Sequence, residues 1–164
     1  MPDGLPEGRS ALAKIVSGGQ TGADRAALDW AIDHRIAHGG WCPRGRRAED
    51  GAIPVRYQLS ETPSERYEER TAWNVRDSDG TVILTLSTAL SGGSLTTAER
   101  ARDLAKPCLH VSQEGDGAAA ADALRHFVDA HSIAVLNVAG PRASGEPGIG
   151  TFVRATLDRA LGTR

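Results

Sequence analysis

Three glycine-rich stretches of this 164-residue chain contain the residues best suited to binding an anion. They read SGGQTGAD at 17–24, LSGGS at 90–94 and AGPRASGEPGIG at 139–150. Glycine lets backbone N–H groups approach a ligand closely, and a helix that begins beyond the loop adds unpaired N–H donors and a partial positive charge. The three stretches therefore predict a ligand with phosphate-like oxygens.

The known nucleotide signatures are absent from these stretches. None of them contains the GxxxxGK[ST] pattern of a P-loop, and the first lacks the GxGxxG spacing of dinucleotide-binding folds. We therefore do not expect a standard nucleotide hydrolase or a nicotinamide-dependent dehydrogenase.

Each glycine-rich stretch lies between a segment typical of a strand and one typical of a helix. Apolar and β-branched runs predict strands at 14–17, 39–42, 81–86, 107–111 and 133–138. Helical spacing of apolar residues and capping signals predict helices at 23–34, 64–77, 95–105, 117–131 and 148–161, with a long loop over 43–63. The alternation predicts an α/β fold with a mostly parallel sheet and helices on both faces. In such a sheet the loops that follow the strands all open on one edge, where ligands bind.

Composition limits the other classes of function. The net charge of −2 provides no general attraction to nucleic acid or to an acidic membrane, and no apolar run reaches the roughly 18 residues of a membrane span. Cys42 and Cys108 have no metal-ligand spacing, so we expect no metal site and a reducing, cytoplasmic location. Residues 1–12 are predicted to be a flexible leader and 13–164 a single ligand-binding domain.

Longer segments of the chain resemble the molybdenum cofactor carrier proteins. The segments are SGGQTGADRAALD, GGWCPRGRRAEDGAIP, YQLSET, RTAWNVRDSDGTVIL and LNVAGPRASGEPGI, in that order, within residues 14–161. That family belongs to a larger Rossmann-like group of nucleotide-ligand binders, the lysine decarboxylase-like (SLOG) group. The resemblance implies a three-layer α/β/α Rossmann-like domain.

The resemblance also implies a function without chemistry of its own. The protein would bind the molybdenum cofactor (molybdopterin), a phosphorylated pterin, as a homo-oligomer (dimer or tetramer), and pass it to molybdoenzymes. Arg142 is the expected phosphate partner, and Trp41 could stack on the pterin. The residues expected to bind the cofactor are Gly18, Gly19, Gln20, Thr21, Gly22, Trp41, Gly92, Gly93, Ser94, Thr96, Gly140, Pro141, Arg142 and Gly148.

A second resemblance supports an alternative function. The segments ERTAWNVRDSDGTVIL and SGGSLTTAE are similar to phosphoribohydrolases of the same group, which release cytokinin bases from nucleoside 5′-monophosphates. In those enzymes the residues at the positions of Arg70 and Glu99 are catalytic, and a carboxylate there would stabilise an oxocarbenium-like ribose. Ser91 and Leu95 depart from the enzyme pattern, and Leu95 replaces a glycine that would tolerate a positive φ. A nucleotide-ligand sensor is a third possibility.

Two further groups of residues have more than one interpretation. Asp24 either caps the first helix or binds the ligand, and capping is the preferred interpretation. Arg44, Arg46 and Arg47 lie in a mixed-charge loop and could clamp a phosphate or contact a second subunit.

Overall fold

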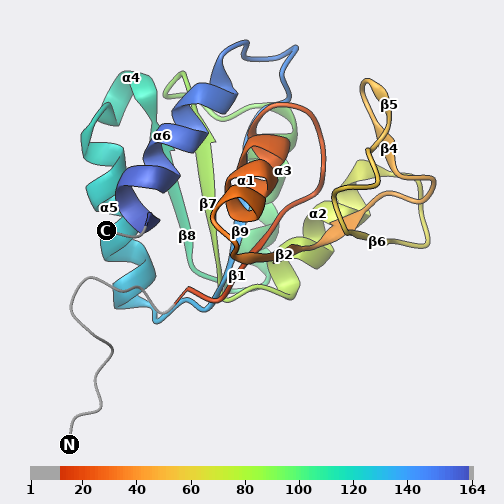
Figure 1. Cartoon of the computed structure of the whole chain (residues 1–164), viewed down its shortest axis with the longest axis horizontal. Helices are drawn as coiled ribbons and strands as arrows, with labels where there is room; N and C mark the ends of the chain where they lie inside the picture. The colour runs from red at the N-terminus through yellow and green to blue at the C-terminus, as the bar shows by residue number, and fades with distance from the viewer. Residues whose placement is uncertain (1–11, 163–164) are drawn as a thin grey trace, which may run out of the picture.

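The computed structural model describes residues 12–162 and has a parallel sheet at its centre (Figure 1). The strand order is β2-β1-β9-β7-β8, and every neighbouring pair is parallel. Helices cover both faces of the sheet, so the fold is the predicted three-layer α/β/α Rossmann-like one. The five strands are β1 (Lys14–Val16), β2 (Ala37–Gly39), β7 (Gly80–Thr85), β8 (Cys108–Ser112) and β9 (Val135–Ala139).

The helices divide between the two faces according to the direction in which the chain crosses the sheet. The crossover from β1 to β2 leads towards the β2 edge of the sheet, and the crossover from β7 to β8 leads towards the β8 edge. Because crossovers between parallel strands are right-handed, the helices of these two crossovers lie on opposite faces of the sheet. On one face α1 (Ala23–Asp33) and α5 (Ala119–Ala130) both pack against α6 (Ile149–Leu161). On the other, α2 (Tyr67–Arg76) packs against α3 (Gly92–Asp103). The short α4 (Gln113–Asp116) follows β8.

The main core lies between the sheet and the helices. Strand β7 is buried along its whole length, because helices cover both of its faces. Helix α6 buries one side, at the spacing of a helix that packs along one face: Ile149, Phe152, Val153, Thr156, Leu157, Ala160 and Leu161. All five predicted helices are present, although α3 begins three residues before its predicted start.

The predicted strand at 39–42 is wrong in its extent. The sheet strand β2 ends at Gly39, and Gly40 has a φ of 125°, which breaks the strand. The next two residues form β3 (Trp41–Cys42), which pairs with β6 (Ser60–Glu61) in a separate two-stranded sheet. A strand of two residues has no periodicity that a sequence pattern can detect.

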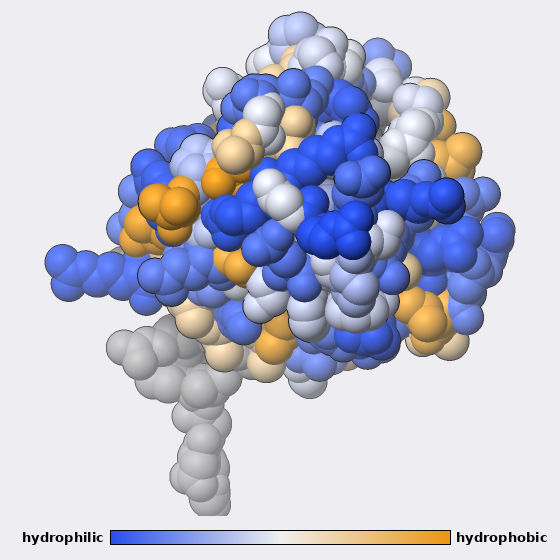
Figure 2. Space-filling view, turned by 90° about the vertical axis from the view of Figure 1, so that its right-hand side faces the viewer, coloured by the Kyte–Doolittle hydropathy of each residue, from blue (hydrophilic) through white to orange (hydrophobic). Residues whose placement is uncertain are grey.

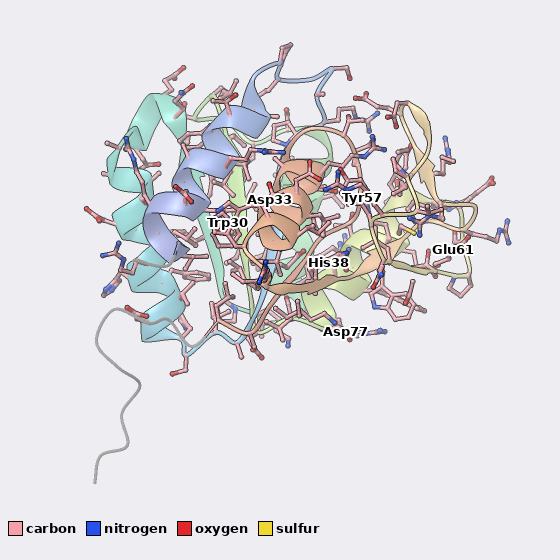
Figure 3. All side chains as sticks on the ribbon, viewed as in Figure 1. Trp30, Asp33, His38, Tyr57, Glu61 and Asp77 are labelled. Carbon is pink, nitrogen blue, oxygen red and sulfur yellow. The ribbon has the colours of Figure 1, made fainter. Side chains whose placement is uncertain are left out.

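The predicted loop at 43–63 is also more ordered in structure than expected. It contains β6 and the hairpin of β4 (Arg47–Ala48) and β5 (Gly51–Ala52), and it closes a second small core around Leu28, Cys42, Ala48, Ile53 and Tyr57. The Tyr57 hydroxyl donates to Asp29 of α1 at 2.7 Å, and Tyr57 lies beside α1 in Figure 3. The segment is therefore attached to the first helix.

Arg46 explains how this segment keeps its shape without long strands. Its guanidinium donates to the carbonyl oxygens of Ile53 (3.1 Å), Pro54 (2.8 Å) and Tyr57 (2.7 Å). These bonds occupy the planar fork of donors. Arg46 was considered as a residue that clamps a phosphate or contacts a second subunit. Its guanidinium instead supports the backbone of this segment.

None of the helices within residues 12–162 has the length and apolar character needed to cross a bilayer. The leader predicted at 1–12 lies outside the described residues except for Leu12, which packs against the main core.

Candidate functional site

A cavity of about 350 Å³ opens at the carboxyl edge of the sheet. It lies beside β1 and β9, where the crossovers from β1 and β7 diverge, which is the place where open α/β sheets bind ligands. Its volume is within the range of small-molecule sites. Its lining combines the loop after β1, the loop after β9, helix α2 and the start of α3: Gly18, Gln20, Asp24, Arg70, Thr71, Asn74, Ser91, Gly92, Gly93, Ser94, Thr97, Asn137, Val138, Ala139, Gly140, Pro141, Arg142 and Gly145.

The first glycine-rich loop is packed tightly by its own protein. A Cβ on Gly18 would lie 2.2 Å from Nη1 of Arg70, so this position has no room for a side chain unless Arg70 moves. Gly22 has a φ of 80°, and a Cβ there would lie 2.6 Å from the backbone oxygen of Pro141 and the backbone nitrogen of Ala143. Gly22 is therefore required for the loop to fit against the third glycine-rich stretch, whereas Gly18 leaves the space that Arg70 of α2 occupies.

Asp24 and Arg70 form a buried ion pair in the cavity wall. The distance from Nη1 of Arg70 to Oδ2 of Asp24 is 3.6 Å, and Arg70 also donates to the carbonyl oxygen of Gly18 at 3.0 Å. The backbone N–H of Gln20 donates to Asp24 at 3.2 Å. Burial raises the pKa of Asp24, against the opposing effect of the Arg70 guanidinium. Each charge of the pair has its counter-charge within the protein.

Asp24 is not the helix cap that the sequence suggested. The N-cap residue of α1 is Gly22, with no side-chain cap bond, and Asp24 lies inside the first turn. Its carboxylate accepts from the loop that precedes the helix, so it holds that loop in place.

The start of α3 forms the opposite wall and is open. The helix begins at Gly92, and a Cβ on Gly92 or Gly93 would meet no atom within 4 Å. The backbone N–H groups of Ser94 and Leu95 donate to the carbonyl oxygen of Ser91. The N–H groups that precede them, those of Gly92 and Gly93, are at the helix start, where N–H groups have no acceptor within the helix. This wall can therefore present backbone donors and the positive end of the helix dipole to a ligand.

The third glycine-rich stretch contributes the cation of the site. Arg142 lines the cavity, and its guanidinium lies 5.6 Å from the centre of the Tyr67 ring, which Arg47 and Arg70 approach at 5.0 and 5.2 Å. Within residues 12–162, Arg142 makes no ion pair at 4 Å or less. It therefore provides the cavity with a positive charge that Asp24 does not neutralise.

The β4–β5 hairpin is attached to the loops around the cavity. The Glu49 carboxylate accepts from the hydroxyls of Ser144 and Thr21 and from the backbone N–H of Ser144 at 3.3 Å, and these contacts, that of the Ser144 hydroxyl above all, lower its pKa. Asp50 pairs with Arg25 of α1 through two bonds of 2.6 and 2.8 Å. The face of the molecule on this side is mainly hydrophilic, with separate hydrophobic patches (Figure 2).

Comparison with known proteins identifies the family of the chain. Residues 15–161 match the model of the circularly permutated YpsA SLOG family. The chain belongs to this family. A solved structure from Syntrophus aciditrophicus SB, named a putative molybdenum carrier protein, is 47% identical, with a TM-score of 0.88, covering 93% of this chain and 97% of that one. No curated protein matches the chain.

The SLOG fold brings many of the expected site residues together. Of the residues predicted to bind the cofactor, those lining the cavity are Gly18, Gln20, Gly92, Gly93, Ser94, Gly140, Pro141 and Arg142. Those outside the lining are Gly19, Thr21, Gly22, Trp41, Thr96 and Gly148. Of the residues considered for hydrolysis, Arg70 lines the cavity and Glu99 does not.

Trp41 lies elsewhere than expected. Its indole N–H donates at 2.8 Å to Asp77, which follows α2 and precedes β7, at the opposite edge of the sheet (Figure 3). Asn74 holds the backbone of Trp41 from both sides, through bonds of 2.8 and 3.0 Å. Trp41 therefore does not line this cavity, because β3 is not an extension of the sheet strand.

Leu95, which replaces a glycine of the phosphoribohydrolase pattern, causes no backbone strain. Leu95 lies within α3 and is not among the residues with positive φ, so a glycine is not needed there.

Several polar residues of the cavity were missed from the sequence. Thr71, Asn74 and Thr97 lie on helices, and nothing local distinguishes them from surface residues. Asn137 was detectable, because it interrupts an otherwise apolar strand; its side chain is buried and donates to Thr81 at 3.2 Å. Among the described residues, no group of three or more His, Cys, Asp and Glu is placed to hold a metal ion.

Proposed function

We propose that this protein binds the molybdenum cofactor in the cavity and carries it to molybdoenzymes. The observation that carries the proposal is the open start of α3 facing the same cavity as Arg142, whose charge has no ion-pair partner among the described residues. The name of the 47% identical structure supports molybdenum carriage, and membership of the SLOG family supports a nucleotide-like ligand. The proposal includes the cytoplasmic location and the homo-oligomer expected from the sequence.

The terminal phosphate of the cofactor is the group that this arrangement suits best. Backbone N–H groups of Gly92 and Gly93 at the helix start would donate to its oxygens, as anion sites at helix N-termini do. The guanidinium of Arg142 would add a charge-assisted bond. Thr96, also expected to bind, directs its hydroxyl to the carbonyl oxygen of Gly92 at 3.3 Å and so belongs to the helix itself.

The geometry supports binding over hydrolysis. A carboxylate that acts on a ribose must reach the reacting bond, and Glu99 is not part of the cavity lining. The carboxylate that does line the cavity, Asp24, is paired with Arg70. Release of free base from a nucleotide is therefore an outcome that the experiment must detect but that we do not expect.

The test is retention of the cofactor by the purified protein. We expect molybdenum and pterin to co-elute with the protein in gel filtration, and Arg142→Ala to weaken retention roughly tenfold or more through loss of a charge-assisted bond. Arg102→Ala removes an exposed arginine of α3 outside the cavity and is the matched control. A wild-type peak without molybdenum and pterin would reject the proposal. Release of adenine from adenosine 5′-monophosphate that stops in Glu99→Gln would establish the hydrolase instead.

A further inference from the structure

Gln20 has a buried amide of which only one end is satisfied. The residue is 5% exposed and lines the cavity. Its Oε1 accepts from the backbone N–H groups of Thr21 at 3.1 Å and Glu49 at 2.9 Å. Its Nε2 is buried without a hydrogen-bond partner, which among the described residues is true of only one other side-chain atom, Nε of Arg100 outside the cavity.

The orientation of this amide follows from its neighbours. Two N–H donors converge on one end of the side chain, and only the carbonyl oxygen can accept both. Turning the amide over would place the NH₂ group against two other donors. The NH₂ group is therefore held as the donor that remains, in a residue that forms part of the cavity wall.

The side-chain amide of Asn74, in the same cavity wall, has a purely structural role. Asn74 is 3% exposed and also lines the cavity. Its Oδ1 accepts from the backbone N–H of Trp41 at 2.8 Å, and its Nδ2 donates to the carbonyl oxygen of Trp41 at 3.0 Å. Both ends of Asn74 are used within the protein, whereas one end of Gln20 is left over.

We propose that Nε2 of Gln20 donates to an unprotonated oxygen of the bound ligand, so that Gln20 selects a hydrogen-bond acceptor at this point. A buried donor left without a partner is unfavourable, and a ligand oxygen removes that cost whereas a ligand N–H or O–H donor does not. The acceptor is a phosphate oxygen or a ring carbonyl oxygen, which share this chemistry. The inference rests on the proposed function, since it concerns the same cavity.

The experiment compares Gln20→Glu with the wild type. Glutamate has the same shape and keeps the accepting oxygen, but it replaces the NH₂ donor by a second oxygen. The probes are the molybdenum cofactor and inorganic pyrophosphate, each read by the rise in melting temperature and by equilibrium binding. We expect binding to weaken roughly 10- to 100-fold, with the unliganded variant still folded at a lower melting temperature because the new charge is buried. Gln20→Met removes the donor without adding a charge and should weaken binding roughly tenfold; it also removes the oxygen that accepts from Thr21 and Glu49, so its melting temperature should fall.

Two matched variants separate this role from the alternatives. Gln58→Glu makes the same chemical change at an exposed position and should leave binding and melting temperature unchanged. Asn74→Asp replaces an amide that is satisfied at both ends, and should lower the melting temperature of the unliganded protein because an oxygen then faces the carbonyl oxygen of Trp41.

The outcomes distinguish the inference from the function on which it rests. Weaker binding of both probes in Gln20→Glu and in Gln20→Met assigns the acceptor to a phosphate, and weaker binding of the cofactor alone in both variants assigns it to a ring oxygen; either supports the inference. Binding that is lost in Gln20→Glu but kept in Gln20→Met is repulsion by the new charge and overturns the inference. If Gln20→Glu binds both probes as tightly as the wild type does, the inference is overturned and the proposed function stands. Failure of both Gln20 variants to fold also overturns it, since the amide is then structural. A wild type that binds neither probe overturns the proposed function and the inference together.

Discussion

The two walls of the cavity use glycine for different reasons. In the loop after β1, added Cβ atoms at Gly18 and Gly22 would collide with Arg70 and with the backbone of residues 141–143. At the start of α3, added Cβ atoms at Gly92 and Gly93 would meet nothing within 4 Å. Gly92 has a positive φ of 52°, which glycine tolerates best, but Gly93 does not. Nothing in the described fold therefore requires a glycine at position 93.

This difference separates glycines that build the protein from a glycine that leaves space for something else. A tightly packed glycine is explained by its neighbours, and its replacement should first affect folding. An open glycine in a helix is itself slightly unfavourable, so its presence at the cavity favours close approach of a ligand. Substitutions that act on stability or on binding can test the division directly.

The largest expected effect is at the packed wall. Gly22→Ala combines a positive φ with a backbone collision, and we expect it to lower the free energy of unfolding by about 3 kcal/mol, measured by chemical denaturation. Gly45 is a matched control, since its φ of 83° is nearly that of Gly22 at 80° but a Cβ there meets nothing within 4 Å. Gly45→Ala should cost only about 1–2 kcal/mol. Equal losses in the two variants would show that packing is not the reason for Gly22.

The support behind the packed wall gives the next effect. A Cβ on Gly19 would lie 2.7 Å from Leu59 and 2.9 Å from Ile53, in the segment that Arg46 holds. Arg46→Ala removes the bonds to the backbone carbonyls and should lower the free energy of unfolding by roughly 2 kcal/mol, with faster proteolysis within 53–59.

Arg44→Ala is the control for this change. Arg44 donates to a single carbonyl oxygen, that of Pro63, at 3.0 Å, and its loss should cost roughly 0.5 kcal/mol. A comparable loss in both variants would contradict the role given to Arg46.

At the open wall we expect an effect on binding without a loss of stability. Gly93→Ala should keep or raise the free energy of unfolding, by up to about 1 kcal/mol, because alanine favours the helix. It should weaken retention of the molybdenum cofactor roughly tenfold, since the methyl group occupies space at the anion site.

Gly150→Ala tests whether any glycine of a helix start behaves in this way. Gly150 lies in the first turn of α6, where a Cβ would make an ordinary contact of 3.6 Å with Ala26, and it is outside the cavity lining. Cofactor retention should stay at the wild-type level in Gly150→Ala. Unchanged retention in Gly93→Ala would remove the distinction between the two walls.

The smallest effect is the pH dependence of the contact that holds the 53–59 segment on α1. Burial and the hydrogen bond to Asp29 raise the pKa of Tyr57 from 10.0 to about 12. Between these values the unfolded chain loses the phenolic proton and the folded protein keeps it, so stability should fall as the pH rises from 10 towards 12. Denaturation of wild type and Tyr57→Phe across this range measures the contribution, which should be missing from the variant. The same slope in both proteins would contradict it.

The order of elements was predictable because it depends on local patterns. The apolar run of β7 and the one-sided apolar spacing of α6 each reflect burial against the rest of the fold, and both appear in the sequence at the right positions. The place of the cavity followed from the same patterns, since loops after parallel strands share one edge. The hairpin β4–β5 and the position of Trp41 were missed, because contacts between distant segments decide them.

The sequence by itself determined the fold class, the family and the edge of the sheet at which the glycine-rich stretches meet. Only the tertiary structure decided which residues of those stretches are packed and which are available. Arg46 and Arg142 have the same side chain, yet one donates to backbone carbonyls and the other lines the cavity. Gln20 and Asn74 differ in the same way, with one amide end left over in Gln20. The reason is physical: whether a donor or a charge is satisfied depends on atoms that the fold brings from elsewhere in the chain.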